Sequence, residues 1–248
     1  MWKSEYLEPI VAISTCTIGF AAYFFIANAS LLYNLFEKEV GKENNLAGWV
    51  VFQRLTGVLF LGIIPAMIGL TLFSKTPIEF GIKANNLLPT LYWILGLSAF
   101  IIPINLIHAR KPDNIKIYPQ IRAKKWTIKL ILINVFTWAA YLFAYEFLFR
   151  GFLLFSCLPA EALTQAGKPV LEIWPAIAIN TAIYSLVHIP KGIKETLGAI
   201  PFGILLCIIT FDTGTIWAAF FIHLILALSN DLIAIFANTE MQFRIKNE

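Results

Sequence analysis

Charge is scarce in this sequence. Charged residues make up 14% of its 248 positions and the mean hydropathy is +0.74, whereas soluble domains carry about 25% charged residues. These values exclude a soluble globular domain and predict an integral membrane protein. No polar stretch between the apolar segments is long enough to form a separate soluble domain. The function must therefore lie within the membrane bundle or at its rim.

Cysteine is equally scarce, and this excludes a disulfide-stabilised scaffold. The three cysteines, Cys16, Cys157 and Cys207, all lie in apolar segments, so we expect free, buried thiols. The net charge of +4 is spread over loops and forms no basic domain that could bind nucleic acid. We therefore expect the lipid bilayer and a membrane-proximal peptide or protein to be its partners.

Long apolar runs predict an all-α fold, a polytopic transmembrane bundle of about seven spans in the cell membrane. A span needs about 20 mostly apolar residues. By that rule the helices are 9–36, 48–74, 90–108, 126–158, 171–190, 195–211 and 214–237. The fourth is too long for one untilted span, so we expect it to tilt, to begin with an interfacial turn near Trp126, or to break near Gly151.

The chain divides into three predicted regions. Residues 1–125 hold the first three helices and a basic loop, residues 126–237 form the core, and residues 238–248 are a short polar tail. Lysine and arginine are concentrated in loops one, three and five, which predicts that these loops are cytoplasmic. Arg54 lies near the loop-one end of the second helix. It could snorkel to the interface or pair across the bundle, and we expect it to snorkel.

Ionisable residues are rare in the apolar runs, and two of them share one helix face. Glu146 and Arg150 are four residues apart in the fourth segment. An ionised side chain at bilayer depth costs at least a few kcal/mol, so such residues are usually functional. They could simply neutralise each other, or Arg150 could set the charge and orientation of a catalytic carboxylate.

Two of the three histidines, His188 and His223, also lie in predicted spans. At 1.5 Å per residue from one membrane face, Glu146, His188 and His223 lie roughly 19, 25 and 13 Å deep. With a boundary error of about 6 Å, they can meet near mid-bilayer. Asn230 follows His223 on nearly the same face, about 10 Å further along the helix. We predict one polar pocket.

Three chemistries remain open for one acid and two histidines. Glu146 could act as general base, activating water through or alongside His188, while His223 and Asn230 stabilise an oxyanion. The acid and both histidines could instead bind zinc and leave one position open for water. A proton relay in a small proton-coupled carrier is the third possibility.

These residues resemble a known set of motifs. The pattern Glu-Glu-x-x-x-Arg, aromatic-x-x-x-His and His-x-x-x-Asn is typical of the CPBP family of intramembrane proteases, which includes the type II CAAX prenyl endopeptidases and bacterial relatives linked to bacteriocin processing or immunity. The motifs stand here as Tyr145-Glu146-x-x-x-Arg150, Tyr184-x-x-x-His188 and a stretch beginning at His223. The resemblance covers about residues 126–237.

The resemblance implies a membrane-embedded endopeptidase that cleaves membrane-proximal peptides with a Glu/His/His site and no obligate cofactor. Its site residues would be Glu146, His188, His223, Arg150 and Asn230. Two positions depart from the family pattern: Tyr145 replaces the first glutamate, and Ala227 replaces the polar residue after the second histidine. A non-catalytic member, acting as a bacteriocin-immunity or membrane-scaffolding factor, is the alternative.

Overall fold

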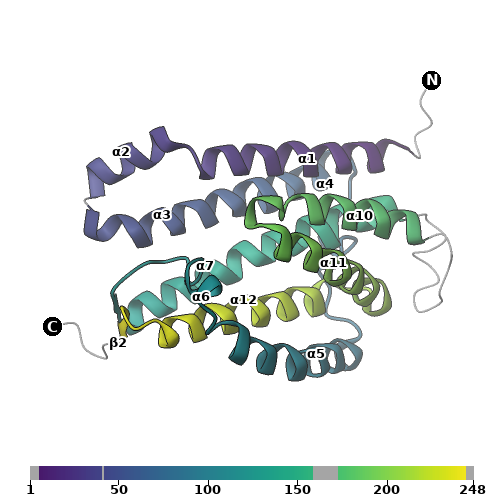
Figure 1. Cartoon of the computed structure of the whole chain (residues 1–248). Coiled ribbons are helices and arrows are strands. Elements are labelled where there is room, and N and C mark those ends of the chain that lie inside the picture. Colours follow the sequence, from purple (N-terminus) through teal and green to yellow (C-terminus); the bar gives the residue numbers. More distant parts are fainter. Residues whose placement is uncertain (1–5, 41, 159–172, 244–248) are drawn as a thin grey trace.

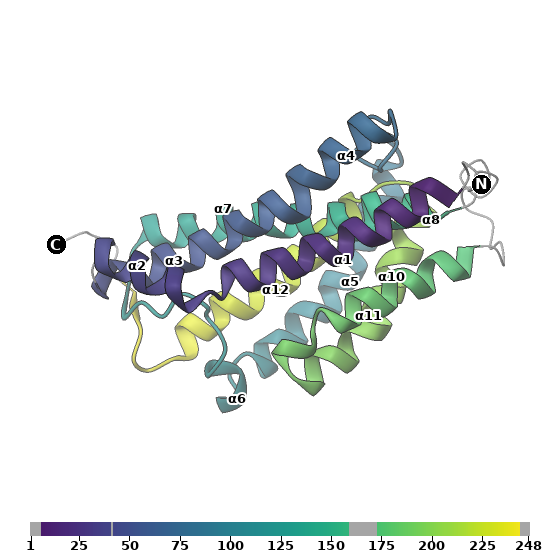
Figure 2. The same ribbon diagram turned by 90° about the horizontal axis from the view of Figure 1, so that it is seen from above.

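The computed structural model describes residues 6–40, 42–158 and 173–243. Its helices run back and forth along one long axis (Figures 1 and 2), and α1 (Leu7–Ala27) begins at the opposite end from the finish of α12 (Trp217–Ala237). The described part of the chain contains six helices that are long and apolar enough to span a membrane. The all-α, multi-pass membrane bundle predicted from composition is therefore confirmed.

Two of the six spans are composite. The second joins α3 (Lys42–Gly57), a π-helical turn η2 (Val58–Ile63) and α4 (Ile64–Leu72). The fourth joins α7 (Ile128–Glu146), a π-helical turn η3 (Phe147–Leu153) and α8 (Leu154–Cys157). The remaining single-helix spans are α1, α5 (Leu87–His108), α11 (Ile193–Thr213) and α12.

Two predicted segments differ from the helices that form. Segment 9–36 becomes α1 and α2 (Ser30–Val40), since the Asn28 side chain donates to the Phe24 carbonyl and ends α1. Within segment 171–190, which begins outside the described residues, α10 (Trp174–Leu186) has only 13 residues. That length gives about 20 Å, short of the roughly 30 Å hydrocarbon core. The described residues therefore contain six candidate spans instead of seven, because α10 is too short to be one.

The long fourth segment changes its hydrogen bonding near Gly151 instead of breaking there. Gly151 lies inside η3, and a Cβ atom at this position would come within 2.9 Å of the Phe80 carbonyl oxygen. Only glycine therefore lets the segment that contains Phe80 pack so closely. Single π-helical turns within α-helices often occur at functional sites.

A short β pairing closes one end of the bundle. The strand β1 (Lys125–Trp126) precedes α7 and pairs in parallel with β2 (Gln242–Phe243) from the predicted polar tail. The Thr127 side chain then caps α7 by accepting from the Leu130 N–H at 3.2 Å. The short helix α6 (Pro112–Ile115) lies in the preceding basic loop.

The prediction that Arg54 snorkels is wrong. Arg54 is buried, and its Nη1 donates to Asn134 Oδ1 at 2.9 Å and to Thr137 Oγ1 at 2.8 Å. Its guanidinium lies 4.2 Å from the centre of the Trp138 ring. Asn134 in turn donates to the fully buried Asp231 at 2.7 Å. Its polar partners on α7 thus hold the Nη1 group inside the bundle, and the side chain does not reach the interface.

The three cysteines are free, as predicted, with Cys16 and Cys207 buried and Cys157 partly buried. The largest buried apolar cluster surrounds η3 and α8 and extends to α1, α10 and α11. The π-helical turn that follows Glu146 therefore lies at the centre of the molecule, where its neighbours hold its position on several sides.

A glycine next to η2 gives a direct test of this packing. A Cβ atom on Gly57 would lie 2.5 Å from the Tyr141 ring. We expect Gly57→Ala to lower the free energy of unfolding by about 1–3 kcal/mol through overpacking. The control is Gly96→Ala in α5, where a Cβ meets nothing within 4 Å. Unfolding of the purified variants in mixed micelles measures the difference, and equal stability of the two variants would contradict the packing.

Candidate functional site

The predicted site residues come from four separate parts of the described chain. Glu146 ends α7, and Arg150 lies in η3. His188 lies just after α10, between it and the short 3₁₀ turn η5 (Ile189–Lys191). His223 and Asn230 both belong to α12.

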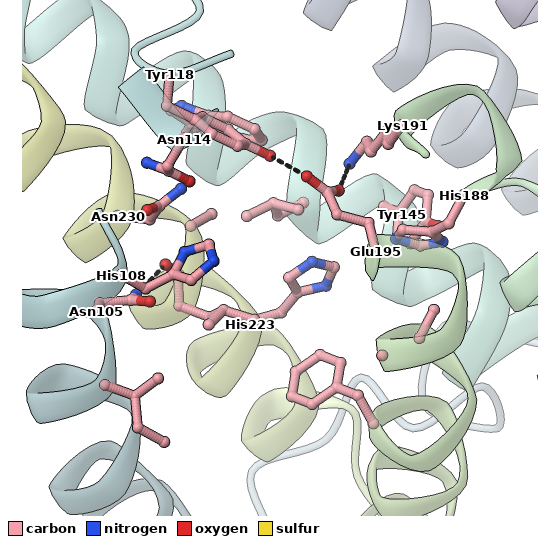
Figure 3. Close-up of a pocket in the computed structure, with 18 of the residues that line it drawn as sticks. Asn105, His108, Asn114, Tyr118, Tyr145, His188, Lys191, Glu195, His223 and Asn230 are labelled. Atoms are coloured by element: carbon pink, nitrogen blue, oxygen red, sulfur yellow. Dashed lines mark hydrogen bonds and ion pairs between the residues drawn. The ribbon is translucent and has the colours of Figure 1, made fainter. Parts of the chain in front are cut away.

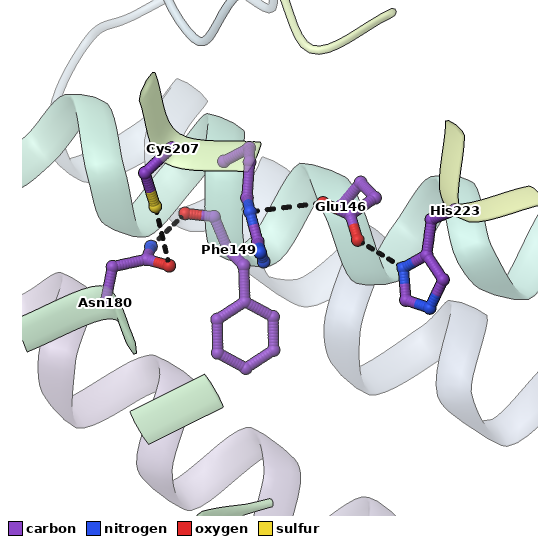
Figure 4. A network of polar contacts seen from close by, with 6 residues as sticks. Glu146, Phe149, Asn180, Cys207 and His223 are labelled. Atoms are coloured by element: carbon purple, nitrogen blue, oxygen red, sulfur yellow. Dashed lines mark hydrogen bonds and ion pairs between the residues drawn. The ribbon is translucent and has the colours of Figure 1, made fainter. Parts of the chain in front are cut away.

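Glu146 and His223 form a direct pair. Glu146 is fully buried, and its Oε1 lies 2.5 Å from Nδ1 of His223 (Figure 4). A carboxylate can only accept a hydrogen bond, so Nδ1 carries the proton and donates it. The lone pair of the neutral ring is therefore on Nε2.

Arg150 supports the carboxylate from the other side. Its Nε lies 3.3 Å from Glu146 Oε2, and both side chains are fully buried. The guanidinium carbon also lies 4.2 Å from the centre of the Tyr184 ring. Among the described residues, none of the three guanidinium nitrogens has a hydrogen-bond acceptor. The charge of Glu146 and the face of Tyr184 are thus what stabilise this buried cation.

His188 is oriented by the backbone of the preceding helix, α10. Its Nδ1 lies 2.7 Å from the carbonyl oxygen of Tyr184. Because a carbonyl oxygen only accepts, Nδ1 again carries the proton and Nε2 keeps the lone pair. Each histidine therefore keeps Nε2 as an acceptor with no donor among the described residues, but one ring is held by a carboxylate and the other by a neutral carbonyl.

Tyr145 stands against both histidine rings. Its ring centre lies 5.8 Å from that of His223 and 6.3 Å from that of His188, nearly perpendicular to each. Tyr145 lines the cavity described below, whereas Glu146 does not. One helical position turns a side chain by about 100°, so the tyrosine faces the cavity while Glu146 faces the interior.

The cavity has a volume of about 580 Å³ and lies between α5, α7, α11 and α12. This volume is within the range of about 300–1,000 Å³ found for sites that bind small molecules. Figure 3 shows Tyr145 and His188 on one side, Asn230 and Asn105 on the other, and His223 between them. His188, His223 and Asn230 thus share one cavity, and Glu146 and Arg150 lie behind its wall.

A polar group lines the cavity near the basic loop. The Tyr118 hydroxyl lies 3.5 Å from Glu195 Oε1, and Lys191 Nζ lies 3.7 Å from Glu195 Oε2 (Figure 3). Glu195 and Lys191 are partly exposed, and exposed His108 lines the same region. This side of the cavity is therefore polar and charged, while the opposite side is aromatic.

Sequence reasoning missed several residues of the site. Asn105 donates to Leu226 O at 2.9 Å and Ser229 Oγ at 2.7 Å, which ties α5 to the helix of His223. Asn180 contacts the π-helical turn that holds Arg150. Each was detectable as a lone amide within an apolar run, and Asn180 precedes Tyr184 by one helical turn.

Metal ligation has a weaker geometric basis. The described residues, which include Glu146, His188 and His223, contain no group of three or more His, Cys, Asp or Glu side chains placed to hold a metal ion. The acid and His223 are in contact, whereas the two histidines line the cavity from different parts of the chain.

Comparison with known proteins gives one family. Residues 125–229 match the family model described as Type II CAAX prenyl endopeptidase Rce1-like. The match includes all three motifs of the sequence resemblance and confirms, for these residues, the family that the motifs predicted. No curated protein and no solved structure matched the chain.

Proposed function

Because residues 125–229 of this chain belong to the Rce1-like type II CAAX prenyl endopeptidase family, we propose that the protein is a membrane-embedded endopeptidase that hydrolyses a membrane-proximal peptide. The observation that carries this proposal is the Glu146–His223 contact at 2.5 Å beside a cavity that His223 lines. This contact orients the His223 imidazole, which has one basic nitrogen available, beside a cavity where a peptide can bind.

The proposed reaction begins with water bound at His223. Nε2 takes one proton from that water while its oxygen attacks the carbonyl carbon of the scissile peptide bond. The tetrahedral intermediate then collapses, the C–N bond breaks, and the imidazolium returns the proton to the leaving amine. A carboxylate held at Nδ1 keeps the ring in the required tautomer and stabilises the imidazolium, as in catalytic triads.

This division of roles makes Glu146 a positioning residue instead of the base that contacts water. The side chain is fully buried and lines no part of the cavity, so it acts through His223. Arg150 balances the buried negative charge of Glu146. His188 Nε2 accepts a hydrogen bond from the same water and directs its lone pair toward the substrate.

Asn230 has a separate proposed role in substrate binding. It lines the cavity, and its buried Oδ1 has no donor among the described residues. Two helical turns, or about 10 Å, separate it from His223, too far for both to contact one oxyanion. We assign its carboxamide to the main chain of the bound peptide, whose N–H groups need an acceptor away from water.

A cleavage assay with matched histidine variants tests the function. Protein in vesicles is incubated with membrane-anchored peptides, and products are identified by mass spectrometry. We expect His188→Ala to lower the rate by about 100-fold, the lower end of the range for acid–base groups, and exposed His108→Ala to leave it within about twofold. Because the proposed steps use only side chains and water, cleavage should persist in EDTA. Equal rates in both variants would contradict the proposal, and loss of cleavage in EDTA would favour the zinc alternative.

One observation favours a second candidate, a family member that binds peptides without cutting them. The Tyr145 ring lines the cavity at the position of the first motif glutamate and contacts both histidine rings. Such a protein would act as an immunity or scaffolding factor. It would bind the anchored peptide, release no product, and keep its biological effect when His223 is replaced.

A further inference from the structure

The π-helical turn η3 links the proposed dyad to a pair of buried residues on two other helices. Its Phe149 carbonyl accepts from the Leu154 N–H, five residues further on. That carbonyl belongs to the peptide unit that joins Phe149 to Arg150, so its direction determines where the Arg150 side chain starts. Because π-helical turns are rarely stable by themselves, the geometry here needs outside support.

Asn180 on α10 supplies that support. Asn180 is fully buried, and its Nδ2 donates to the same Phe149 carbonyl at 2.5 Å. Its Oδ1 accepts from Sγ of buried Cys207 on α11 at 3.3 Å (Figure 4). The Phe149 carbonyl requires the NH₂ end of the carboxamide, since only that end can donate to a carbonyl, and the thiol donates to the opposite end.

The helix α10 also contacts the Arg150 side chain, one turn after Asn180. There the Tyr184 ring lies 4.2 Å from the guanidinium carbon. Asn180 thus holds the backbone before Arg150, and Tyr184 holds its charged end. Arg150 Nε is 3.3 Å from Glu146, which in turn contacts His223. A continuous series of contacts therefore runs from Cys207 to the proposed base.

We propose that Asn180 is a positioning residue for the Glu146–His223 pair, acting through the Phe149–Arg150 peptide unit and oriented by Cys207. The inference rests on the proposed function for its catalytic consequence, but the alignment itself is a property of the folded protein. Asn180 lines no part of the cavity, so its effect is on the alignment of the reacting groups and leaves substrate binding unchanged. Small misplacements of catalytic groups are costly, about 100-fold for 1 Å.

Kinetics provide the first readout. We expect Asn180→Ala to lower kcat by about 10–100-fold with KM within about twofold, because the cavity wall is intact. Cys207→Ala should lower kcat by about 2–10-fold, the equivalent of one net hydrogen bond, and Cys207→Ser should restore it by keeping a donor. The matched control is Thr181→Val, since buried Thr181 Oγ1 has no partner among the described residues.

Nuclear magnetic resonance provides a readout that does not depend on activity. The chain has three histidines, so ¹⁵N-histidine labelling yields three ring systems. The His223 Nδ1 proton, hydrogen-bonded to Glu146, should shift in Asn180→Ala and in Cys207→Ala, and stay unchanged in Thr181→Val and Cys207→Ser. The His108 signals should stay constant throughout.

The outcomes separate the inference from the proposed function. A wild type that cleaves nothing, together with a shifted His223 signal in Asn180→Ala, would support the positioning role and remove the protease proposal. An active wild type with unchanged kcat and His223 signal in Asn180→Ala would overturn the positioning role. If Asn180→Ala does not fold, the comparison of Cys207→Ala with Cys207→Ser decides. The same kcat and the same His223 signal in these two variants would overturn the positioning role.

Discussion

Replacing His223 with alanine is expected to lower kcat/KM for peptide cleavage by about 10³–10⁴-fold, because the variant lacks the base and the acid of the proposed reaction. Glu146→Gln should reach a similar loss. A glutamine can donate to Nδ1 as well as accept from it, so the ring loses the preference for the tautomer with a free Nε2. Initial rates with the anchored peptide in vesicles measure both effects.

The double variant makes this prediction sharper. Glu146 acts through His223, so Glu146→Gln combined with His223→Ala should be no slower than His223→Ala alone, as expected for residues that work as one unit. Glu195→Gln serves as the control, because Glu195 also lines the cavity region but lies outside the dyad. If the losses in kcat/KM multiply in the double variant, or if Glu146→Gln is active, Glu146 and His223 do not act as one unit.

Replacing Arg150 with methionine is expected to lower the free energy of unfolding by about 3–5 kcal/mol, the usual cost of leaving one member of a buried ion pair alone. Arg150 and Glu146 are both fully buried, so no water reaches the stranded carboxylate. Reversible unfolding in mixed micelles, monitored by circular dichroism, measures the loss. Exposed Lys129→Met on α7 is the control and should stay within about 0.5 kcal/mol of wild type.

A second substitution should recover much of that loss. In the pair Glu146→Gln with Arg150→Met, no buried charge remains, and replacing a buried ion pair with neutral groups is often close to neutral for stability. We therefore expect the double variant to be more stable than Arg150→Met alone. A double variant less stable than Arg150→Met would show that the two side chains do not compensate each other.

Much of the fold was predictable because burial in lipid imposes strong local rules. Long apolar runs must form helices there, since every backbone polar group needs a partner within the segment. Arg54 shows where such rules fail. An arginine near a predicted helix end is equally compatible with snorkelling and with an internal network, and only the positions of Asn134 and Thr137 on α7 decided for the network. The short length of α10 could not be predicted either, because an apolar run does not show how many of its residues are helical.

The sequence by itself determined the membrane class, the family and the small set of ionisable residues in the spans. Each follows from composition or from motif spacing, which are local properties. Only the tertiary structure decided that Tyr145 faces the cavity while Glu146 lies behind it, in contact with His223 and Arg150. The physical reason is that a partner on another helix depends on helix rotation and packing. Neighbouring helix residues point about 100° apart, so one can line the cavity while the next is buried. The spacing of motifs along the chain does not show which of the two faces the cavity.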